Sequence, residues 1–156
     1  MYCESDVTTT QYGDIEHFRP KSRYPELEFD WNNLGFACRT CNHKKLAKFD
    51  EDTPYIDPYS ENPNEFFVFF GPLIRPLHAS ERAALTINDI GLNRPELIEK
   101  RNEKISEIDA FIGTWATKTN QTLKDNARQA LINLCKGKNE FSMLVKSYLK
   151  AQEIIQ

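Results

Sequence analysis

The sequence has no hydrophobic run approaching the roughly 20 apolar residues that a membrane-spanning helix needs. Its first residues also lack the basic and apolar segments of a secretory signal peptide. Cysteine is scarce, with four residues, and there is no internal repeat or low-complexity tract. These absences argue against a membrane protein and predict a cytoplasmic one, in which cysteines stay reduced. Under reducing conditions a Cys-x-x-Cys pair binds metal more often than it forms a disulfide.

An excess of positive charge is also missing. The formal net charge is −3, although phosphate binding by proteins is largely electrostatic. Any nucleic acid should therefore bind weakly unless a partner adds affinity. The hydrophobic content of 40% and the charged content of 28% are typical of a soluble globular protein with one domain, or a small core with an appendage. The basic residues of the first third lie around the motifs described next: Arg19, Lys21, Arg23, Arg39, Lys44, Lys45 and Lys48.

An acidic residue next to a histidine is the first feature that indicates chemistry. Glu16 precedes His17, so that a metal ligand lies beside a proton acceptor whose neutral form is well populated near pH 7. An isolated Glu-His pair is usually a solvated pair at the end of a strand. Two later residues reverse this interpretation: Asn33, and Asn42 directly after a Cys-x-x-Cys pair.

Hydrolysis of a phosphodiester needs a general base, a site for the charge of the transition state and relief for the leaving oxygen. One divalent cation can meet the last two needs. Glu16 and Asn42 offer the oxygen donors that Mg²⁺ or Mn²⁺ would take, and Asp14 is an alternative to Glu16. Lys45, one helical turn beyond Asn42, is predicted to reach a phosphate oxygen.

The loop after the histidine carries basic and aromatic residues. Arg19 and Lys21 are predicted to contact the phosphate backbone of a substrate because they share this loop. Tyr24, Phe29 and Trp31 could stack on bases. The alternation of aromatic and polar residues around Phe29 and Trp31 is typical of a strand, however, and it favours core positions for these two rings.

The cysteines indicate a second metal site. Cys38 and Cys41 are half of a tetrahedral zinc site that would stabilise a small core, and Cys3 is the natural third ligand. The fourth ligand stays open. His43 lies beside the pair, whereas Cys135 falls on the apolar side of a predicted helix, where a free buried cysteine is usual. The simpler alternative is that Cys38 and Cys41 are reduced, buried thiols.

Together, Asp14–His17, Trp31–Leu34 and Cys38–Lys45 resemble the signature of HNH, or ββα-metal, nucleases, over roughly the first third of the chain. The resemblance implies that His17 is the general base and that Asn33 orients the loop of His17 without being a ligand. It also implies attack by water, which leaves a 5′-phosphate and a 3′-hydroxyl. It leaves open whether the substrate is DNA or RNA and which ion is used.

The resemblance continues beyond the core, to the HNH proteins of prokaryotic anti-phage systems. These are the nuclease subunits of Septu and of certain retrons, which work beside an ATPase, so the resemblance implies an ATPase partner. The amino-terminal knuckle of that branch is Cys-x-Tyr-Cys-Glu; Tyr2-Cys3-Glu4 match it, and its first cysteine would precede Met1. The similar later segments are Ile56–Tyr59, Glu61-x-Pro63, Thr86-Ile87, Gly91–Arg94 and Leu97-x-x-x-Arg101.

The order of elements predicts an α+β fold in three parts. Residues 1–50 are expected to form a ββα-metal core with a zinc knuckle, residues 51–94 a loop and β-hairpin packed on it, and residues 95–156 a three-helix region that could dock a partner. The predicted strands are 14–18, 29–38, 66–70 and 73–77, and the first predicted helix is 42–49.

The main alternative is a non-catalytic zinc-stabilised module that binds a nucleic acid or a protein. Such a module would use the same cysteines but has no need of an acid–histidine pair with an oxygen donor after the knuckle. An HNH protein that cleaves the host's own RNA would differ in substrate and not in mechanism.

Overall fold

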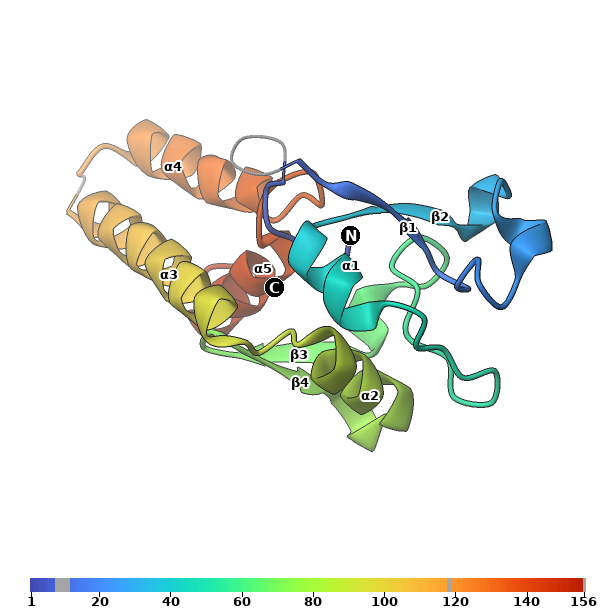
Figure 1. Cartoon of the computed structure of the whole chain (residues 1–156). Coiled ribbons are helices and arrows are strands. Elements are labelled where there is room, and N and C mark those ends of the chain that lie inside the picture. The colour runs from blue at the N-terminus through green and yellow to red at the C-terminus, as the bar shows by residue number, and fades with distance from the viewer. Residues whose placement is uncertain (8–11, 118, 156) are drawn as a thin grey trace. The chain divides into compact units, whose positions relative to one another are not determined.

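The residues that the computed structural model describes are 1–7, 12–117 and 119–155. The chain divides into two compact units (Figure 1). Met1–Val68 and Ile74–Arg94 form the first unit, and Phe69–Leu73 and Pro95–Gln156 form the second. Helices and two small two-stranded sheets occur in the described residues, which confirms the predicted α+β class.

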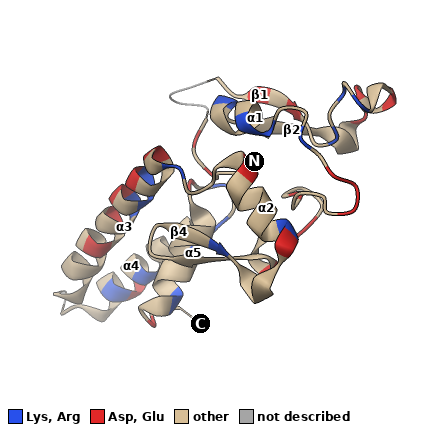
Figure 2. Ribbon diagram, turned by 60° about the horizontal axis from the view of Figure 1, so that its bottom comes forward, with Lys and Arg blue, Asp and Glu red and all other residues tan. Residues whose placement is uncertain are grey.

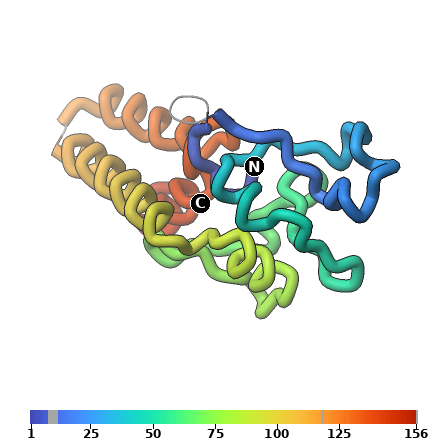
Figure 3. Tube along the Cα trace, in the orientation of Figure 1, coloured from blue at the N-terminus to red at the C-terminus, as the bar shows by residue number. Residues whose placement is uncertain are grey.

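The first unit begins with a ββα arrangement. Two short antiparallel strands are joined by a long connection with two 3₁₀ turns, and a helix follows the second strand; the path of the connection can be followed in Figure 3. Cys38 begins the helix, since its sulfur accepts a hydrogen bond from the backbone N–H of Cys41. The elements are β1 Asp14–His17, η1 Pro25–Leu27, η2 Trp31–Asn33, β2 Leu34–Ala37 and α1 Arg39–Lys45.

The second strand is shorter than predicted. The segment 29–38 is not a continuous strand, because the carboxylate of Asp30 accepts a hydrogen bond from the backbone N–H of Asn32 and begins η2. The prediction that Phe29 and Trp31 are core residues was wrong, since their exposed fractions are 88% and 84%. The alternation of aromatic and polar residues falls on turns, and there it does not place alternate side chains on a buried face.

A hairpin and a helix that packs on α1 follow; the turn of the hairpin, Phe69–Leu73, belongs to the second unit, and the helix belongs to the first. Sequence reasoning missed α2, although its signals are present: Ser80 accepts a hydrogen bond from the N–H of Ala83, and Gly91 has the left-handed φ of 67° that ends many helices. The predicted buried strand is only partly buried, because Phe67 faces the core while Phe70 is 68% exposed. The elements are η3 Pro63–Glu65, β3 Phe67–Phe70, β4 Leu73–Pro76, η4 Leu77–Ala79 and α2 Glu81–Ile90.

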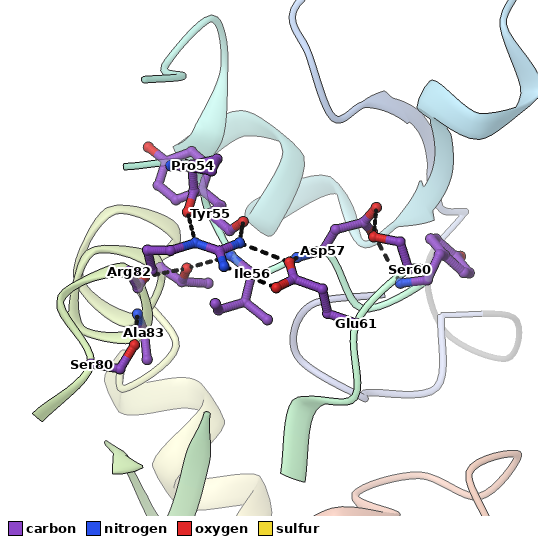
Figure 4. A network of polar contacts seen from close by, with 11 residues as sticks. Pro54, Tyr55, Ile56, Asp57, Ser60, Glu61, Ser80, Arg82 and Ala83 are labelled. Atoms are coloured by element: carbon purple, nitrogen blue, oxygen red, sulfur yellow. Dashed lines mark hydrogen bonds and ion pairs between the residues drawn. The ribbon is translucent and has the colours of Figure 1, made fainter. Parts of the chain in front are cut away.

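Arg82 of α2 holds the long loop after α1 in place (Figure 4). Its guanidinium donates to both carboxylate oxygens of Glu61, at 2.9 and 2.8 Å, and to the backbone oxygens of Pro54 and Tyr55 at 2.8 and 3.1 Å. Burial by itself would raise the pKa of Glu61. The hydrogen bonds from Arg82 and from the N–H of Asp57 together have the larger effect, so the pKa of this carboxyl is lowered overall.

We expect Arg82→Lys to destabilise the protein by about 2 kcal/mol, because an ammonium cannot replace a bidentate guanidinium or reach both backbone oxygens. Urea unfolding followed by circular dichroism measures the loss. The contribution of Glu61 is fully present above its ordinary pKa of 4.5 and is lost as the pH falls through its lowered value in the folded protein. If Arg82→Lys lowered the free energy of unfolding as much well below pH 4.5 as at pH 7, the ion pair with Glu61 would not be the cause.

The second unit is a bundle of three helices, as predicted from the apolar spacing. Pro95 occupies the first helical position that suits proline. The helices are α3 Pro95–Ala116, α4 Gln121–Leu134 and α5 Ser142–Ala151, and each packs on the other two. Their core contains Ile108, Leu131, Val145 and Leu149, with Ile112, Cys135, Tyr148, Ile154 and Ile155 packed against it.

The surface of the second unit is mixed in charge. Figure 2 shows acidic and basic residues interspersed along α3. Near the start of this helix, Arg101 is buried, with its guanidinium over the ring of Phe69 and a hydrogen bond from Nη1 to the carbonyl of Pro72 at 3.1 Å. No helix in the described residues is long and apolar enough to cross a membrane.

Candidate active site and metal centre

Two acidic side chains of β1 face α1. Asp14 and Glu16 are two residues apart, so they point to the same side of the strand. Asn42 and Lys45 are three residues apart on α1 and lie on one helix face. Asn42 Nδ2 donates to Asp14 Oδ2 at 3.2 Å, and Lys45 Nζ lies 2.6 Å from Glu16 Oε1. The strand and the helix are therefore joined by two polar pairs.

The Glu16–Lys45 pair is internal. The exposed fractions of the two residues are 2% and 0%, and Lys45 Nζ also donates to the backbone oxygen of His17 at 2.9 Å. Burial raises the pKa of Glu16 and the ion pair with Lys45 opposes this rise; burial likewise lowers the pKa of Lys45. Sequence reasoning expected Glu16 to bind an ion and Lys45 to reach a phosphate. In this arrangement each is occupied by the other and neither is accessible.

The Asp14–Asn42 pair is open to solvent on one side, since both residues are only half-buried. The Asn42 amide points its nitrogen at Asp14. A rotation of this amide about its last bond would present its oxygen beside the Asp14 carboxylate, which gives two hard oxygen donors from one strand and one helix. Of the acids considered in the sequence, Asp14 is thus the one in contact with Asn42.

His17 ends β1 and is half-buried. Its Nε2 lies 3.0 Å from the backbone oxygen of Glu28. A carbonyl oxygen can only accept, so this contact requires the proton on Nε2 and leaves the lone pair of the neutral ring on Nδ1. Within the described residues, no hydrogen bond joins the His17 ring to Glu16 or Asn42. The ring is therefore fixed by the loop, with its second nitrogen free to accept a proton.

Asn33 holds the segment that follows His17. Its side chain is buried; Oδ1 accepts from the N–H of Arg19 at 2.7 Å, and Nδ2 donates to the carbonyls of Arg19 and Leu27 at 3.0 and 3.2 Å. The backbone oxygen of Asn33 also accepts from the N–H of Phe18 at 2.9 Å. These bonds tie the residues after His17 to the turn before Glu28, which is the position expected of a residue that orients this loop.

The two basic residues predicted to bind substrate both contact other side chains of the first unit. The Arg19 guanidinium lies over the rings of Tyr24 and Phe49, at 5.5 and 5.4 Å from their centroids. Lys21 forms an exposed ion pair with Glu28 at 3.1 Å. An exposed ion pair of this kind contributes little energy, so Lys21 can exchange its partner for a phosphate at low cost.

The structure brings the three predicted cysteines together. The sulfurs of Cys3, Cys38 and Cys41 lie within 4.8 Å of one another, and all three residues are buried. Three soft sulfur donors at this spacing fit the thiolate part of a tetrahedral zinc site. No histidine, carboxylate or further cysteine of the described residues joins this cluster, so His43 is not its fourth member.

Arg94 is a neighbour of this cluster that sequence reasoning did not identify. Its Nη1 and Nη2 lie 3.5 and 3.8 Å from the sulfurs of Cys41 and Cys38. A guanidinium there stabilises negative charge on sulfur. Hydrogen bonds from Cys38 and Cys41 lower the pKa of Cys3. Hydrogen bonds with Cys3 and Cys38 raise the pKa of Cys41.

Comparison with known proteins assigns a family to the first part of the chain. Residues 1–48 match the family model of the HNH endonuclease. Over 139 residues the chain is 30% identical to Septu protein PtuB of Bacillus mycoides (strain KBAB4), covering 69% of this chain and 47% of that protein. It is 35% identical over 71 residues to Septu protein PtuB of Bacillus thuringiensis, covering 45% and 28%.

A third relative is the "Retron Vc95 putative HNH endonuclease" of Vibrio cholerae serotype O1 biovar El Tor, with 27% identity over 124 residues, 69% of this chain and 58% of that protein. The chain thus spans between about a quarter and three fifths of the length of these relatives. No solved structure matches it. The ββα arrangement, the acid–histidine strand, the buried asparagine and the match to the family model agree: residues 1–48 are an HNH endonuclease domain.

Proposed function

We propose that this chain is a metal-dependent endonuclease that hydrolyses phosphodiester bonds of DNA or RNA in prokaryotic anti-phage defence. The observation that carries the proposal is the pairing of Asp14 with Asn42 at the start of the strand that ends in His17, inside an HNH domain. Oxygen donors for a cation and a proton acceptor then come from one strand and one helix.

In this proposal Asp14 and Asn42 hold a divalent cation, Mg²⁺ or Mn²⁺, which supplies electrostatic stabilisation of the charge that develops on the phosphate. Glu16 replaces neither of them. Its carboxylate and the Lys45 ammonium form an internal ion pair that fixes β1 against α1 and, through the Lys45 bond to the His17 carbonyl, fixes the backbone of the base.

His17 acts as the general base through Nδ1. It takes a proton from the attacking water while Nε2 keeps its hydrogen bond to the Glu28 carbonyl. The water oxygen forms a bond to phosphorus and the bond to the 3′-oxygen breaks. The leaving 3′-oxygen takes a proton from solvent water, which leaves a 5′-phosphate and a 3′-hydroxyl. Asn33 is a positioning residue, because it acts on the loop that carries the base and not on the reacting atoms.

The names of the relatives support the defence role, since Septu and the Vc95 retron are anti-phage systems. We further propose that an ATPase of the same system is the partner and that the complex acts in the cytoplasm, where the thiols of the zinc cluster stay reduced. The net charge of −3 favours a partner that adds affinity for nucleic acid. A non-catalytic zinc module is the alternative, and it gives the opposite result in the next experiment.

We expect Asp14→Asn and Asn42→Ala to lower the rate of Mg²⁺-dependent nicking of a supercoiled plasmid or a single-stranded RNA by at least 100-fold, because each removes an oxygen donor from the ion. Glu26→Gln is the matched control, since Glu26 is an exposed acid of the same unit. Glu16→Gln should act mainly on stability. If Asp14→Asn nicks like the wild type while folded Glu16→Gln does not, the ion is held by Glu16 instead.

We propose that Cys3, Cys38 and Cys41 hold a structural zinc ion. Purified protein should then contain about one zinc per chain by atomic emission, and Cys38→Ser should lose the metal and unfold the first unit, as small metal-stabilised cores do. Cys135→Ser is the control, because Cys135 packs in the core of the other unit. Wild-type protein that is folded and free of zinc would show that the three are reduced thiols only.

A further inference from the structure

Phe29 and Trp31 are two large aromatic side chains that the fold leaves in water. Their exposed fractions are 88% and 84%, and no ring contact or cation–π contact of either occurs within the part of the chain that the structure describes. Burying either ring would be favourable by itself, since rings of this size each remove a large apolar area from water. Both rings are therefore available to a ligand that packs on them.

The backbone under the two rings is well fixed. The carboxylate of Asp30, between them in sequence, accepts from the backbone N–H of Asn32 at 3.0 Å and from its side-chain amide at 3.2 Å. The N–H of Asp30 donates to the carbonyl of Leu27 at 3.2 Å. Rings presented on such turns lose little conformational entropy when a ligand packs on them.

The segment that carries the rings begins next to the proposed catalytic base. Glu28, whose carbonyl oxygen is 3.0 Å from Nε2 of His17, is the residue directly before Phe29. One residue spans only about 3.8 Å between Cα atoms. A nucleotide whose phosphate is at His17 thus has its base within reach of this segment, which in Figure 1 is the part of the chain between the labelled strands β1 and β2.

The surroundings favour bases over a protein surface. Along the chain the two rings are flanked and separated by polar residues, Glu28, Asp30 and Asn32, so this segment lacks the continuous apolar stretch typical of the centre of a protein interface. The cations of the loop are balanced by its acids, and the phosphate backbone alone would be held weakly. Stacking on an aromatic ring needs neither charge nor a continuous patch. The acids are Glu26, Glu28 and Asp30; the cations are Arg19, Lys21 and Arg23.

We propose that Phe29 and Trp31 form a base-stacking platform and that the preferred substrate is nucleic acid with unpaired bases beside the scissile phosphate. In a duplex the faces of each base are covered by its neighbours, so stacking on these rings would first require unpairing. This inference rests on the proposed nuclease function for the place of the platform, but its test measures binding and not cleavage.

The test is fluorescence anisotropy with a short fluorescein-labelled single-stranded DNA of mixed sequence and with its duplex, without added divalent ion. Wild-type protein should bind the single strand more tightly than the duplex. Phe29→Ala and Trp31→Ala should each weaken binding to the single strand by about tenfold. Trp31→Phe should restore most of the affinity, because it keeps a ring. Phe70→Ala is the matched control, since Phe70 is a 68% exposed phenylalanine of the other unit.

Each outcome decides the matter. Equal affinity of wild type and both alanine variants for the single strand overturns the platform, even if the protein cleaves. Ring-dependent binding by a protein that does not cleave supports the platform and contradicts the nuclease function. If the alanine variants bind nucleic acid normally but lose a protein that copurifies with the wild type, the rings are a protein-docking surface and the proposal is wrong.

Discussion

Replacement of His17 with alanine is expected to reduce the rate of nicking by 10²- to 10⁴-fold, the usual contribution of a general base. The reason is the hydrogen bond from Nε2 to the Glu28 carbonyl, which fixes the ring and leaves Nδ1 as the acceptor. The measurement is the initial rate of plasmid or RNA cleavage at saturating Mg²⁺ or Mn²⁺. Addition of imidazole to the alanine variant should restore part of the rate, because it supplies the missing acceptor.

The chain offers controls of the same residue type, since it has only three histidines. His43 is exposed on α1 directly after Asn42, so His43→Ala tests whether loss of any imidazole near the site is enough. It should keep nearly wild-type cleavage. The free energy of unfolding of His17→Ala should stay within about 1 kcal/mol of the wild-type value, since a single hydrogen bond contributes about that much. Wild-type rates in folded His17→Ala would remove His17 as the base.

The parts of the site that the sequence predicted are those fixed by local chemistry. Cys38 and Cys41 could be recognised because a Cys-x-x-Cys pair is typical of a metal site. Cys3 could be added because Tyr2-Cys3-Glu4 resembles the amino-terminal knuckle of the related HNH proteins. The three carboxy-terminal helices could be predicted because their apolar residues repeat with the helical period over long segments.

The assignment of the two acids could not be predicted. Asp14 and Glu16 alternate onto the same face of β1, so either could have met Asn42. Which one does depends on the packing of α1 against β1, and this is a tertiary property. The helix runs so that Asn42 meets the first acid and Lys45 the second. The sequence shows that the two acids share one face of β1 and that Asn42 and Lys45 share one face of α1. It does not show how far α1 is shifted along β1, which decides which acid meets which partner.

The positions of the aromatic rings were mispredicted for a related reason. Alternation of aromatic and polar residues indicates a half-buried strand only where the backbone is extended. The Asp30 carboxylate caps a turn instead, which places Phe29 and Trp31 in solvent. An Asp followed two residues later by Asn is a recognisable turn signal, and it favours a turn over a strand at this position.

The largest effect on stability is expected from Lys45→Met. It leaves the Glu16 carboxylate buried without its partner, and breaking a buried ion pair on one side costs about 3–5 kcal/mol. Urea unfolding monitored by circular dichroism measures the loss. Lys48→Met is the control for the removal of one lysine, because Lys48 is exposed just beyond the end of α1.

The double variant Glu16→Met with Lys45→Met separates charge from packing. Two apolar side chains of similar volume need no desolvation of charge, so the double variant should recover most of the stability lost in Lys45→Met alone. A double variant as unstable as Lys45→Met would show that the lost hydrogen bond from Lys45 to the His17 carbonyl, and not the unpaired charge, is the cause.

The dependence on pH gives an independent check on Lys45→Met. Burial already raises the pKa of Glu16, and the loss of Lys45 removes the strongest interaction that opposes this rise. A carboxyl whose folded pKa exceeds its unfolded value of 4.5 stabilises the folded state most when it is protonated. The variant should therefore become more stable relative to wild type as the pH falls from 7 toward 5. Restored stability without restored cleavage would then follow, because the His17 carbonyl would still lack the Lys45 donor that fixes the backbone of the base.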